Sequence, residues 1–216
     1  MYTGNVSVGG PAQVRELPML IISKMAVGPH NNNTYLLRCR STGAQLLIDA
    51  AAEGPRIIDL IGPSGLTGII TTHRHADHWQ ALTEVHDATG APLYAHSEDA
   101  PAIEVPTDHL LADGSRISFG DCQVQAIHIV GHTPGSVALL YEDPEGPPHL
   151  FTGDTLFPGG VGKTWSADDF DRLFADVTEK VFATLPGETW VYPGHGGDTT
   201  LGTERPQLAE WKSRGW

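Results

Sequence analysis

Residues 72–78 read Thr72-His73-Arg74-His75-Ala76-Asp77-His78 and follow the apolar run at residues 66–70 after a single threonine, Thr71. Four of these side chains are imidazoles or carboxylates, which bind zinc and its first-row neighbours. On a strand, His73 and His75 point to the same side, because side chains alternate along a strand. A helix that follows from Trp79 turns the chain and aims the aspartate and the last histidine at a neighbouring point. The segment therefore predicts a metal site, with room for two ions at one short loop.

The composition is that of a globular chain with an acidic surface. The 216 residues include 13 basic and 26 acidic side chains, which gives a formal net charge of −13. Such a surface repels phosphate backbones and argues against a nucleic-acid partner held by a broad basic face. No linker, repeat or low-complexity segment interrupts the chain, so we expect a single domain over residues 1–216.

The cysteines and the N-terminus point to a reducing compartment. Cys39 and Cys122 are too few for a four-thiolate zinc site or a disulfide framework. The first residues show no basic segment followed by a signal-length apolar run. The apolar stretch at residues 18–22 is too short to span a membrane. We therefore expect a cytoplasmic protein with no membrane partner, and the sequence leaves the oligomeric state open.

Short β-rich stretches alternate with helical ones in both halves of the chain. Strands are expected at residues 17–24, 34–39, 46–49, 67–71, 93–96, 116–119, 124–129, 136–141, 149–152 and 190–192. Helices are expected at residues 56–61, 79–88, 167–184 and 204–212. This order predicts two sheets that are covered by helices.

Three later loops share one design, in which a ligand-type residue lies in a glycine-rich turn after a short strand. They read Gly131-His132-Thr133-Pro134-Gly135-Ser136, Thr152-Gly153-Asp154-Thr155 and Pro193-Gly194-His195-Gly196-Gly197. Glycine lets the backbone approach closely or take a positive φ, which helps to aim a side chain into a crowded site. Together with the first loop, these turns supply seven candidate metal ligands.

In this order, the motifs HxHxDH, GHTPGS, TGD and PGHG resemble those of the metallo-β-lactamase fold superfamily, and most of all its glyoxalase II (hydroxyacylglutathione hydrolase) branch. The resemblance implies an α/β fold, the four-layer αββα sandwich, with the site at one edge of the sheets. It implies that the first metal is bound by His73, His75 and His132, the second by Asp77, His78 and His195, and both by Asp154. Asp49 matches an acid that orients a ligand imidazole in these proteins.

The resemblance implies a metal-dependent hydrolase with two divalent metal ions. Zinc is the expected metal, although this ligand set also accepts iron or manganese. Two ions about 3.5–4 Å apart can hold a bridging hydroxide and lower its pKa to about 7, which supplies a nucleophile at neutral pH. The second ion can polarise the scissile carbonyl. We expect Asp77 and Asp154 to handle protons as well as to bind metal.

The expected substrate is a thioester of a small thiol carrier. Residues 160–165 resemble the glyoxalase II loop whose lysine contacts that carrier. By this match Lys163 binds an anionic or amide part of the substrate and Trp165 walls the pocket; the alternative for Lys163 is a solvated loop cation. Two departures leave the carrier open. Gly196 stands where glyoxalase II commonly has a tyrosine, and few residues follow His195, which leaves no counterpart of the helical extension that grips glutathione.

Two other activities on the same fold stay open. A persulfide dioxygenase would hold a single iron at the positions that match His73, His132 and Asp154. That branch usually carries an arginine and an acidic residue where this chain has Lys163 and Trp165. A lactonase would use the same centre to open a cyclic ester. A non-enzymatic metal-binding protein is disfavoured, because all seven ligand positions are intact.

Overall fold

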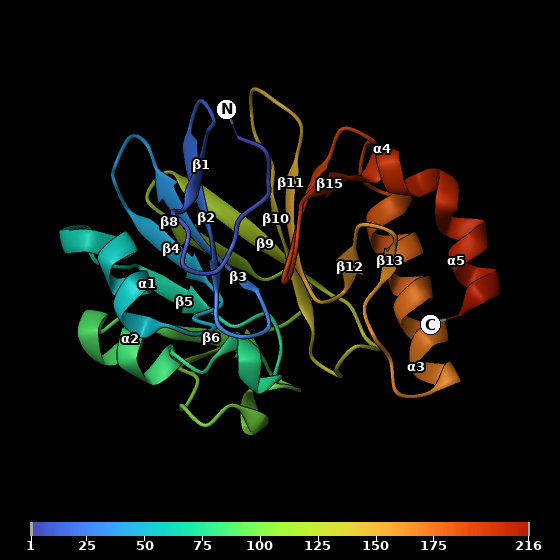
Figure 1. Cartoon of the computed structure of the whole chain (residues 1–216), viewed down its shortest axis with the longest axis horizontal. Coiled ribbons are helices and arrows are strands. Elements are labelled where there is room, and N and C mark those ends of the chain that lie inside the picture. Colours follow the sequence, from blue (N-terminus) through green and yellow to red (C-terminus); the bar gives the residue numbers. More distant parts are fainter. Residues whose placement is uncertain (1, 216) are drawn as a thin grey trace.

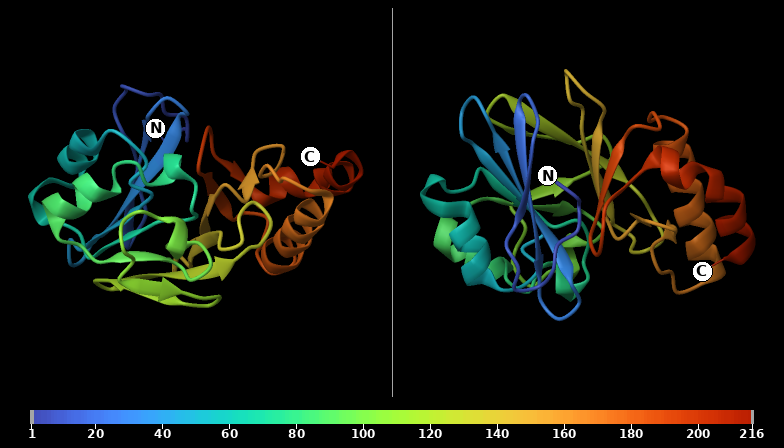
Figure 2. Two further views of the ribbon diagram at one scale, coloured as in Figure 1. Left: turned by 90° about the horizontal axis from the view of Figure 1, so that it is seen from below. Right: turned by 45° about the horizontal axis from the view of Figure 1, so that its top comes forward.

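Two β-sheets lie face to face, and helices cover the outer face of each sheet (Figure 1). The structure is a computed structural model and describes residues 2–215 of the chain. Helices α1 and α2 flank one side and α3 and α5 flank the other, as the two further views in Figure 2 also show. This arrangement confirms the expected αββα sandwich. Among residues 2–215, no helix is long and apolar enough to cross a membrane.

The first sheet has seven strands in sequential order. They are β1 (Gln13–Glu16), β2 (Leu20–Val27), β3 (Asn32–Cys39), β4 (Gln45–Ile48), β5 (Gly68–Ile70), β6 (Leu93–His96) and β7 (His109–Leu111). Strands β1 to β4 pair antiparallel, and β4 to β7 pair parallel. Parallel neighbours need a crossover, and here α1 (Gly54–Ile61) and α2 (Leu82–Thr89) provide the first two.

The second sheet has six strands in the order β15-β14-β11-β10-β9-β8. In chain order they are β8 (Arg116–Phe119), β9 (Cys122–His128), β10 (Val137–Tyr141), β11 (His149–Gly153), β14 (Trp190–Pro193) and β15 (Thr199–Thr200). Only β11 and β14 pair parallel. Strands β12 (Leu156–Phe157) and β13 (Gly160–Val161) form a separate hairpin.

The remaining helices lie mostly in the second half of the chain. Helix α3 (Ala167–Asp176) continues as a π-helix over Val177–Phe182 and belongs to the β11–β14 crossover. Helices α4 (Leu201–Glu204) and α5 (Leu208–Arg214) follow β15. Short 3₁₀ helices lie at Gly62–Ser64, Ala76–His78, Ala100–Ala102 and Arg205–Gln207.

Apolar side chains fill three layers of core. Leu37 and Phe151 belong to the layer between the sheets, where Tyr35 packs edge-on against Phe151 with ring centroids 5.2 Å apart. A second layer lies beneath α1 and α2, and a third beneath α3 and α5. All four residues of β4 are buried, because both faces of the central strands are covered.

Residues 72–78, here called the metal loop, depart from the sequence prediction. Strand β5 ends at Ile70, so the placement of His73 and His75 on a strand is wrong. The backbone N–H of Thr72 donates to the carboxylate of Asp49 at 2.8 Å and not to a neighbouring strand. The next α-helix begins at Leu82, after a 3₁₀ turn at Ala76–His78, and not at Trp79.

A buried ion pair ties the N-terminal segment to the loop that follows β14. The Lys24 ammonium lies 2.5 Å from the Asp198 carboxylate, and their side chains are 0% and 1% exposed. The same ammonium donates to the carbonyl oxygens of Gly4 and Gly196, each at 2.7 Å. Burial lowers the pKa of Lys24, and Asp198 opposes that shift. The pair therefore anchors the loop that carries His195.

We expect Lys24→Met to lower the free energy of unfolding by about 3 kcal/mol or more, because it leaves the Asp198 carboxylate buried without its counter-charge. Urea denaturation followed by circular dichroism measures this loss. Arg40→Met is the control, because it breaks the exposed ion pair with Glu16 and is expected to cost about 1 kcal/mol or less. Equal losses in the two variants would contradict the anchoring role.

Candidate metal centre

Four loops meet at one edge of the sandwich, and each lies on the C-terminal side of a strand. The loop after β5 brings His73, His75, Asp77 and His78; the loops after β9, β11 and β14 bring His132, Asp154 and His195. All seven residues singled out from the sequence thus lie together. They form overlapping groups in which the candidate ligand atoms lie within 4.8 Å of one another.

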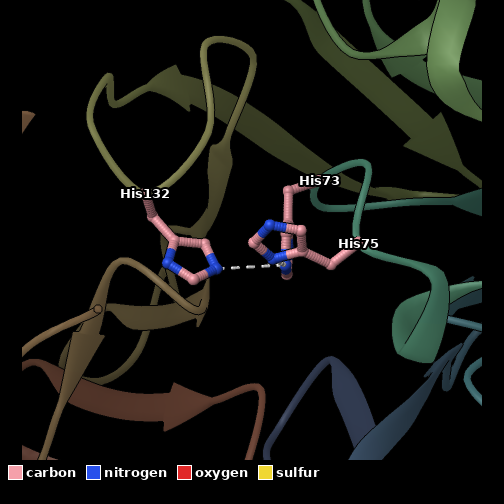
Figure 3. A group of neighbouring side chains, drawn as sticks. All are labelled: His73, His75 and His132. Carbon is pink, nitrogen blue, oxygen red and sulfur yellow. Dashed lines mark hydrogen bonds between the residues drawn. The ribbon is translucent and has the colours of Figure 1, made fainter. Parts of the chain in front are cut away.

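Three histidines form the first group, and their ring nitrogens converge. His73 Nε2 lies 3.0 Å from His75 Nδ1 and 3.3 Å from His132 Nε2. Figure 3 shows His132 approaching from its own loop, opposite the other two rings. Nitrogen ligands of a tetrahedral zinc, at about 2.0–2.1 Å from the ion, are about 3.3–3.4 Å apart. The spacing of these nitrogens therefore fits a zinc-sized ion.

The second group combines two histidines and a carboxylate. His78 Nε2 lies 3.3 Å from His195 Nε2. The Asp77 carboxylate lies 3.8 Å from His78 Nε2 and 3.5 Å from His195 Nε2. These separations also fit the ligand shell of a single divalent ion.

Asp154 lies between the two groups. Its carboxylate is 3.6 Å from His132 Nε2, 3.4 Å from His78 Nε2 and 3.3 Å from His195 Nε2. Burial acts to raise the pKa of Asp154, but the neighbouring imidazoles, His78 first and then His195, outweigh it and hold the pKa well below its usual range. Within the described part of the chain, the buried Oδ1 atom has no hydrogen-bond partner. An unpartnered, ionised carboxylate oxygen at this position fits a metal ion.

Hydrogen bonds on the outer side of three rings fix which nitrogen faces the centre. The Nδ1–H group of His78 donates to the Asp49 carboxylate at 2.8 Å. The Nδ1–H group of His132 donates to the Lys163 carbonyl at 2.7 Å, and that of His195 donates to the His30 carbonyl at 2.9 Å. These partners assign the proton to Nδ1. The Nε2 lone pair of each ring is then directed into the centre, as a metal ligand requires.

The protein keeps the first group in its ligand form. Burial lowers the pKa of His73, His75 and His132, and the neighbouring imidazoles lower the pKa of His73 and His75 further. A metal binds the neutral imidazole, so a lowered pKa favours metal binding at neutral pH.

Asp49 lies where the resemblance placed it, beside a ligand imidazole. Besides His78, its carboxylate accepts from the N–H and the hydroxyl of Thr72, both at 2.8 Å. Its backbone has φ 57°, a left-handed conformation that is uncommon outside glycine. This left-handed backbone conformation directs the Asp49 carboxylate from the end of β4 toward the metal loop.

Asn32 is a site residue that the sequence analysis missed. Its side-chain amide donates to Asp77 Oδ2 at 2.9 Å and lies 3.5 Å from His195 Nε2. It begins β3 and pairs with His195 through an isolated β-bridge. Only this long-range pairing reveals the role, because nothing in the local sequence distinguishes Asn32 from its asparagine neighbours.

Lys163 and Trp165 lie beside the first group. The Trp165 ring is 6.4 Å from the His75 ring, centroid to centroid, and its residue is 67% exposed. The Lys163 ammonium lies 4.8 Å from the centroid of the Trp165 ring. A cavity of about 190 Å³ opens here, lined in part by His132, Trp165 and the arginines Arg74 and Arg172.

One glycine is required by the crowding at the centre. A Cβ atom at Gly194 would lie 2.2 Å from Asp154 Oδ1 and 2.7 Å from His78 Cε1. No side chain fits at these distances, so the glycine before His195 lets two strand-end loops approach one another.

Comparisons with known proteins agree with this geometry. The sequence model of the metallo-beta-lactamase superfamily matches residues 27–195. The chain is 33% identical over 204 residues to the probable metallo-hydrolase YqgX of Bacillus subtilis, which covers 85% of this chain and 94% of that protein. It is 34% identical over 167 residues to a hydroxyacylglutathione hydrolase of Fuscovulum blasticum, which covers 76% of this chain and 62% of that enzyme.

Solved structures are similar over most of the chain. The B3 metallo-beta-lactamase BLEG-1 has a TM-score of 0.74 and 28% identity, over 86% of this chain and 96% of that one. TTHA1623, solved in a di-iron-bound form, has a TM-score of 0.69 and 33% identity, over 84% of this chain and 96% of that one. The chain belongs to the metallo-beta-lactamase superfamily, and the resemblance in its motifs is confirmed. It spans 62% of the length of the hydroxyacylglutathione hydrolase that it matches.

We expect Gly194→Ala to reduce the zinc retained after loading and desalting by at least half, because the added methyl group displaces Asp154 or His78. Metal analysis of the purified protein measures the zinc-to-protein ratio. Gly187→Ala is the matched control, since a Cβ atom there meets its nearest neighbour at an ordinary 3.4 Å. Full zinc content in Gly194→Ala would show that the close approach is not needed for metal binding.

Proposed function

We propose that this protein is a metal-dependent hydrolase that cleaves a thioester of a small thiol carrier. Two divalent metal ions are held by His73, His75 and His132 on one side and by Asp77, His78 and His195 on the other, with Asp154 shared between them. The observation that carries the proposal is the position of Asp154, whose carboxylate lies within 3.6 Å of ring nitrogens from both groups.

The chemistry of the site follows from what its residues hold in place. Bound divalent ions lower the pKa of water and polarise a carbonyl oxygen, which supplies a nucleophile and electrophilic assistance at neutral pH. The outer hydrogen bonds of the imidazoles keep the ligand nitrogens aimed at the centre. We assign the holding and passing of a proton to the carboxylates of Asp77 and Asp154, which both lie at the centre. Asn32 orients the first of these carboxylates.

The substrate class is supported by the loop beside the first group. Lys163 gives a cation and Trp165 an exposed aromatic wall next to His75. A cavity of about 190 Å³, lined in part by His132 and Trp165, adjoins this loop and can take part of a small-molecule substrate. The 34% identity to a hydroxyacylglutathione hydrolase supports the thioester. A lysine and an aromatic residue at this loop suit the carrier end of such a substrate.

Zinc is the metal that we propose, on the nitrogen-rich donor set and its spacing. The relative TTHA1623 was solved with two iron ions, so iron is the second choice. We also propose a cytoplasmic location, which the two free cysteines support.

We expect the zinc-loaded protein to release thiol from a panel of acyl thioesters that includes S-lactoylglutathione. A chromogenic thiol reagent measures the release. Removal of zinc with a chelator is expected to abolish the activity, and added zinc is expected to restore it. His75→Ala and Asp154→Ala are expected to lose metal and activity together, because each removes a ligand from the centre.

The thioester panel, extended by a glutathione persulfide and by lactones, separates the alternative activities. No thiol release from any thioester, with oxygen uptake on a glutathione persulfide by the iron-loaded protein, would replace the hydrolase with a dioxygenase. Hydrolysis of lactones and not of thioesters would keep the metal centre and change the substrate. Undiminished turnover in Asp154→Ala would contradict the shared-ligand assignment.

We expect Lys163→Ala to raise KM for the best thioester by about 10-fold, with little change in kcat, because a charged hydrogen bond to the carrier is lost in the ground and transition states alike. The backbone carbonyl that His132 uses is retained in this variant. Lys212→Ala is the matched control, since its ammonium lies over another ring, that of Phe174, at 6.0 Å. An unchanged KM in Lys163→Ala would return Lys163 to the solvated alternative.

A further inference from the structure

Asp99 connects two of the loops that present metal ligands. It follows β6 and is 0% exposed. Its Oδ2 accepts from the backbone N–H of Arg74 at 2.9 Å and from the hydroxyl of Thr133 at 2.5 Å. Its Oδ1 accepts from the backbone N–H of Gly135 at 2.9 Å. One buried carboxylate thus takes three hydrogen bonds from two loops.

The usual role of such an aspartate does not account for these contacts. Asp99 directly precedes the 3₁₀ helix Ala100–Ala102, where an aspartate commonly caps the first turn. Here the side chain makes no capping bond to that helix. Its oxygens are turned instead toward the loops that follow β5 and β9, which belong to different sheets.

Two of the three bonded residues are chain neighbours of first-group histidines, and Gly135 lies in the turn that follows His132. Arg74 lies between His73 and His75, so fixing its N–H fixes the peptide plane that joins it to His73. Thr133 directly follows His132, and its hydroxyl also lies 2.6 Å from the Ser136 hydroxyl. The carboxylate therefore acts on the directions of all three imidazoles without touching any of them.

The surroundings are built around this carboxylate. A Cβ atom at Gly135 would lie 2.8 Å from Asp99 Cγ, so the turn after His132 needs a glycine in order to pass so close. On the exposed side, the Arg74 guanidinium lies 4.0 Å from Asp99 Oδ1. A backbone bond from Val137 N to Thr72 O, at 2.9 Å, also joins the two loops. That bond keeps the loops adjacent when the carboxylate is altered.

We propose that Asp99 is a positioning residue that sets the angle between the His73–His75 pair and His132, and thereby the affinity of the first metal. The inference rests on the two-metal centre of the proposed function. Asp99→Asn preserves the shape of the side chain, but an NH₂ group replaces one carboxylate oxygen. This donor then faces either the Arg74 N–H and the Thr133 hydroxyl, or the Gly135 N–H. At least one of the three hydrogen bonds is then lost, the two loops shift relative to one another, and the three nitrogens converge less well.

The experiment titrates metal-free protein with zinc in competition with a chromophoric chelator, which resolves two dissociation constants. Anomalous diffraction at the zinc edge identifies the position that each constant describes. Asp99→Asn is expected to weaken zinc at the His73–His75–His132 position by about 10–100-fold and to leave the Asp77–His78–His195 position within about twofold. Asp108→Asn is the matched control, because its carboxylate also accepts a backbone N–H, that of Leu93 at 2.8 Å, away from the ligand loops.

Two results would overturn the proposal. One is that both constants in Asp99→Asn equal those of the native protein. The other is that both positions weaken equally while the unfolding midpoint of the metal-free protein falls, which would make Asp99 a scaffold residue only. A native protein that binds a single zinc at the first position would contradict the two-metal function, and the comparison for Asp99 would then be decided on that one constant.

A second variant tests the inference where Asp99→Asn does not fold. Thr133→Val removes one of the three donors and keeps the carboxylate and the volume of the side chain. It is expected to weaken zinc at the first position alone by about three- to tenfold, the value of one hydrogen bond. Unchanged zinc affinity in Thr133→Val would contradict the proposal independently.

Discussion

The structure depends on bringing seven side chains with lone pairs into one small volume, where their nitrogen and oxygen atoms face one another. Imidazole nitrogens and carboxylate oxygens that face each other at 3.0–3.6 Å are mostly acceptors, and buried acceptors without donors are costly. The cost is met by a metal ion, which replaces the missing donors. The surrounding residues must then prevent the ligand side chains from rotating away to other hydrogen-bond partners when no metal is bound.

The sandwich meets this requirement through the C-terminal sides of its strands. The loops after β5 and β14 come from different sheets, and their approach leaves no room for a side chain at Gly194, where a Cβ atom would lie 2.7 Å from His78 Cε1. The loops after β5, β9 and β14 are then each held by an acceptor that lies outside the centre. Asp49 bonds to the start of the metal loop, while backbone carbonyls take the outer protons of His132 and His195. The fold thus sets the orientation of the ligand side chains, and the ligands provide the affinity for metal.

The seven ligand candidates were predictable from sequence because their spacing within each turn is local. The layers were predictable because apolar runs alternate with amphipathic ones. Strands β1 and β7 were not, since they are edge strands with several exposed positions and no apolar alternation. The roles of Asn32 and Asp99 were also missed. Their partners lie 45 and 25–36 positions away, and no local pattern marks an aspartate that bonds across two loops instead of capping its own turn.

The backbone and the side chain of Lys163 contact two different parts of the centre. Its carbonyl oxygen holds the outer nitrogen of His132, whereas its ammonium lies over the Trp165 ring beside the cavity. The carbonyl is available whatever side chain stands at this position, so the metal centre constrains the backbone and leaves the side chain free to vary. A substrate that shifts this loop must also shift the acceptor of His132. Specificity in such a site can therefore change by substitution at the loop, while its backbone path stays fixed by the metal.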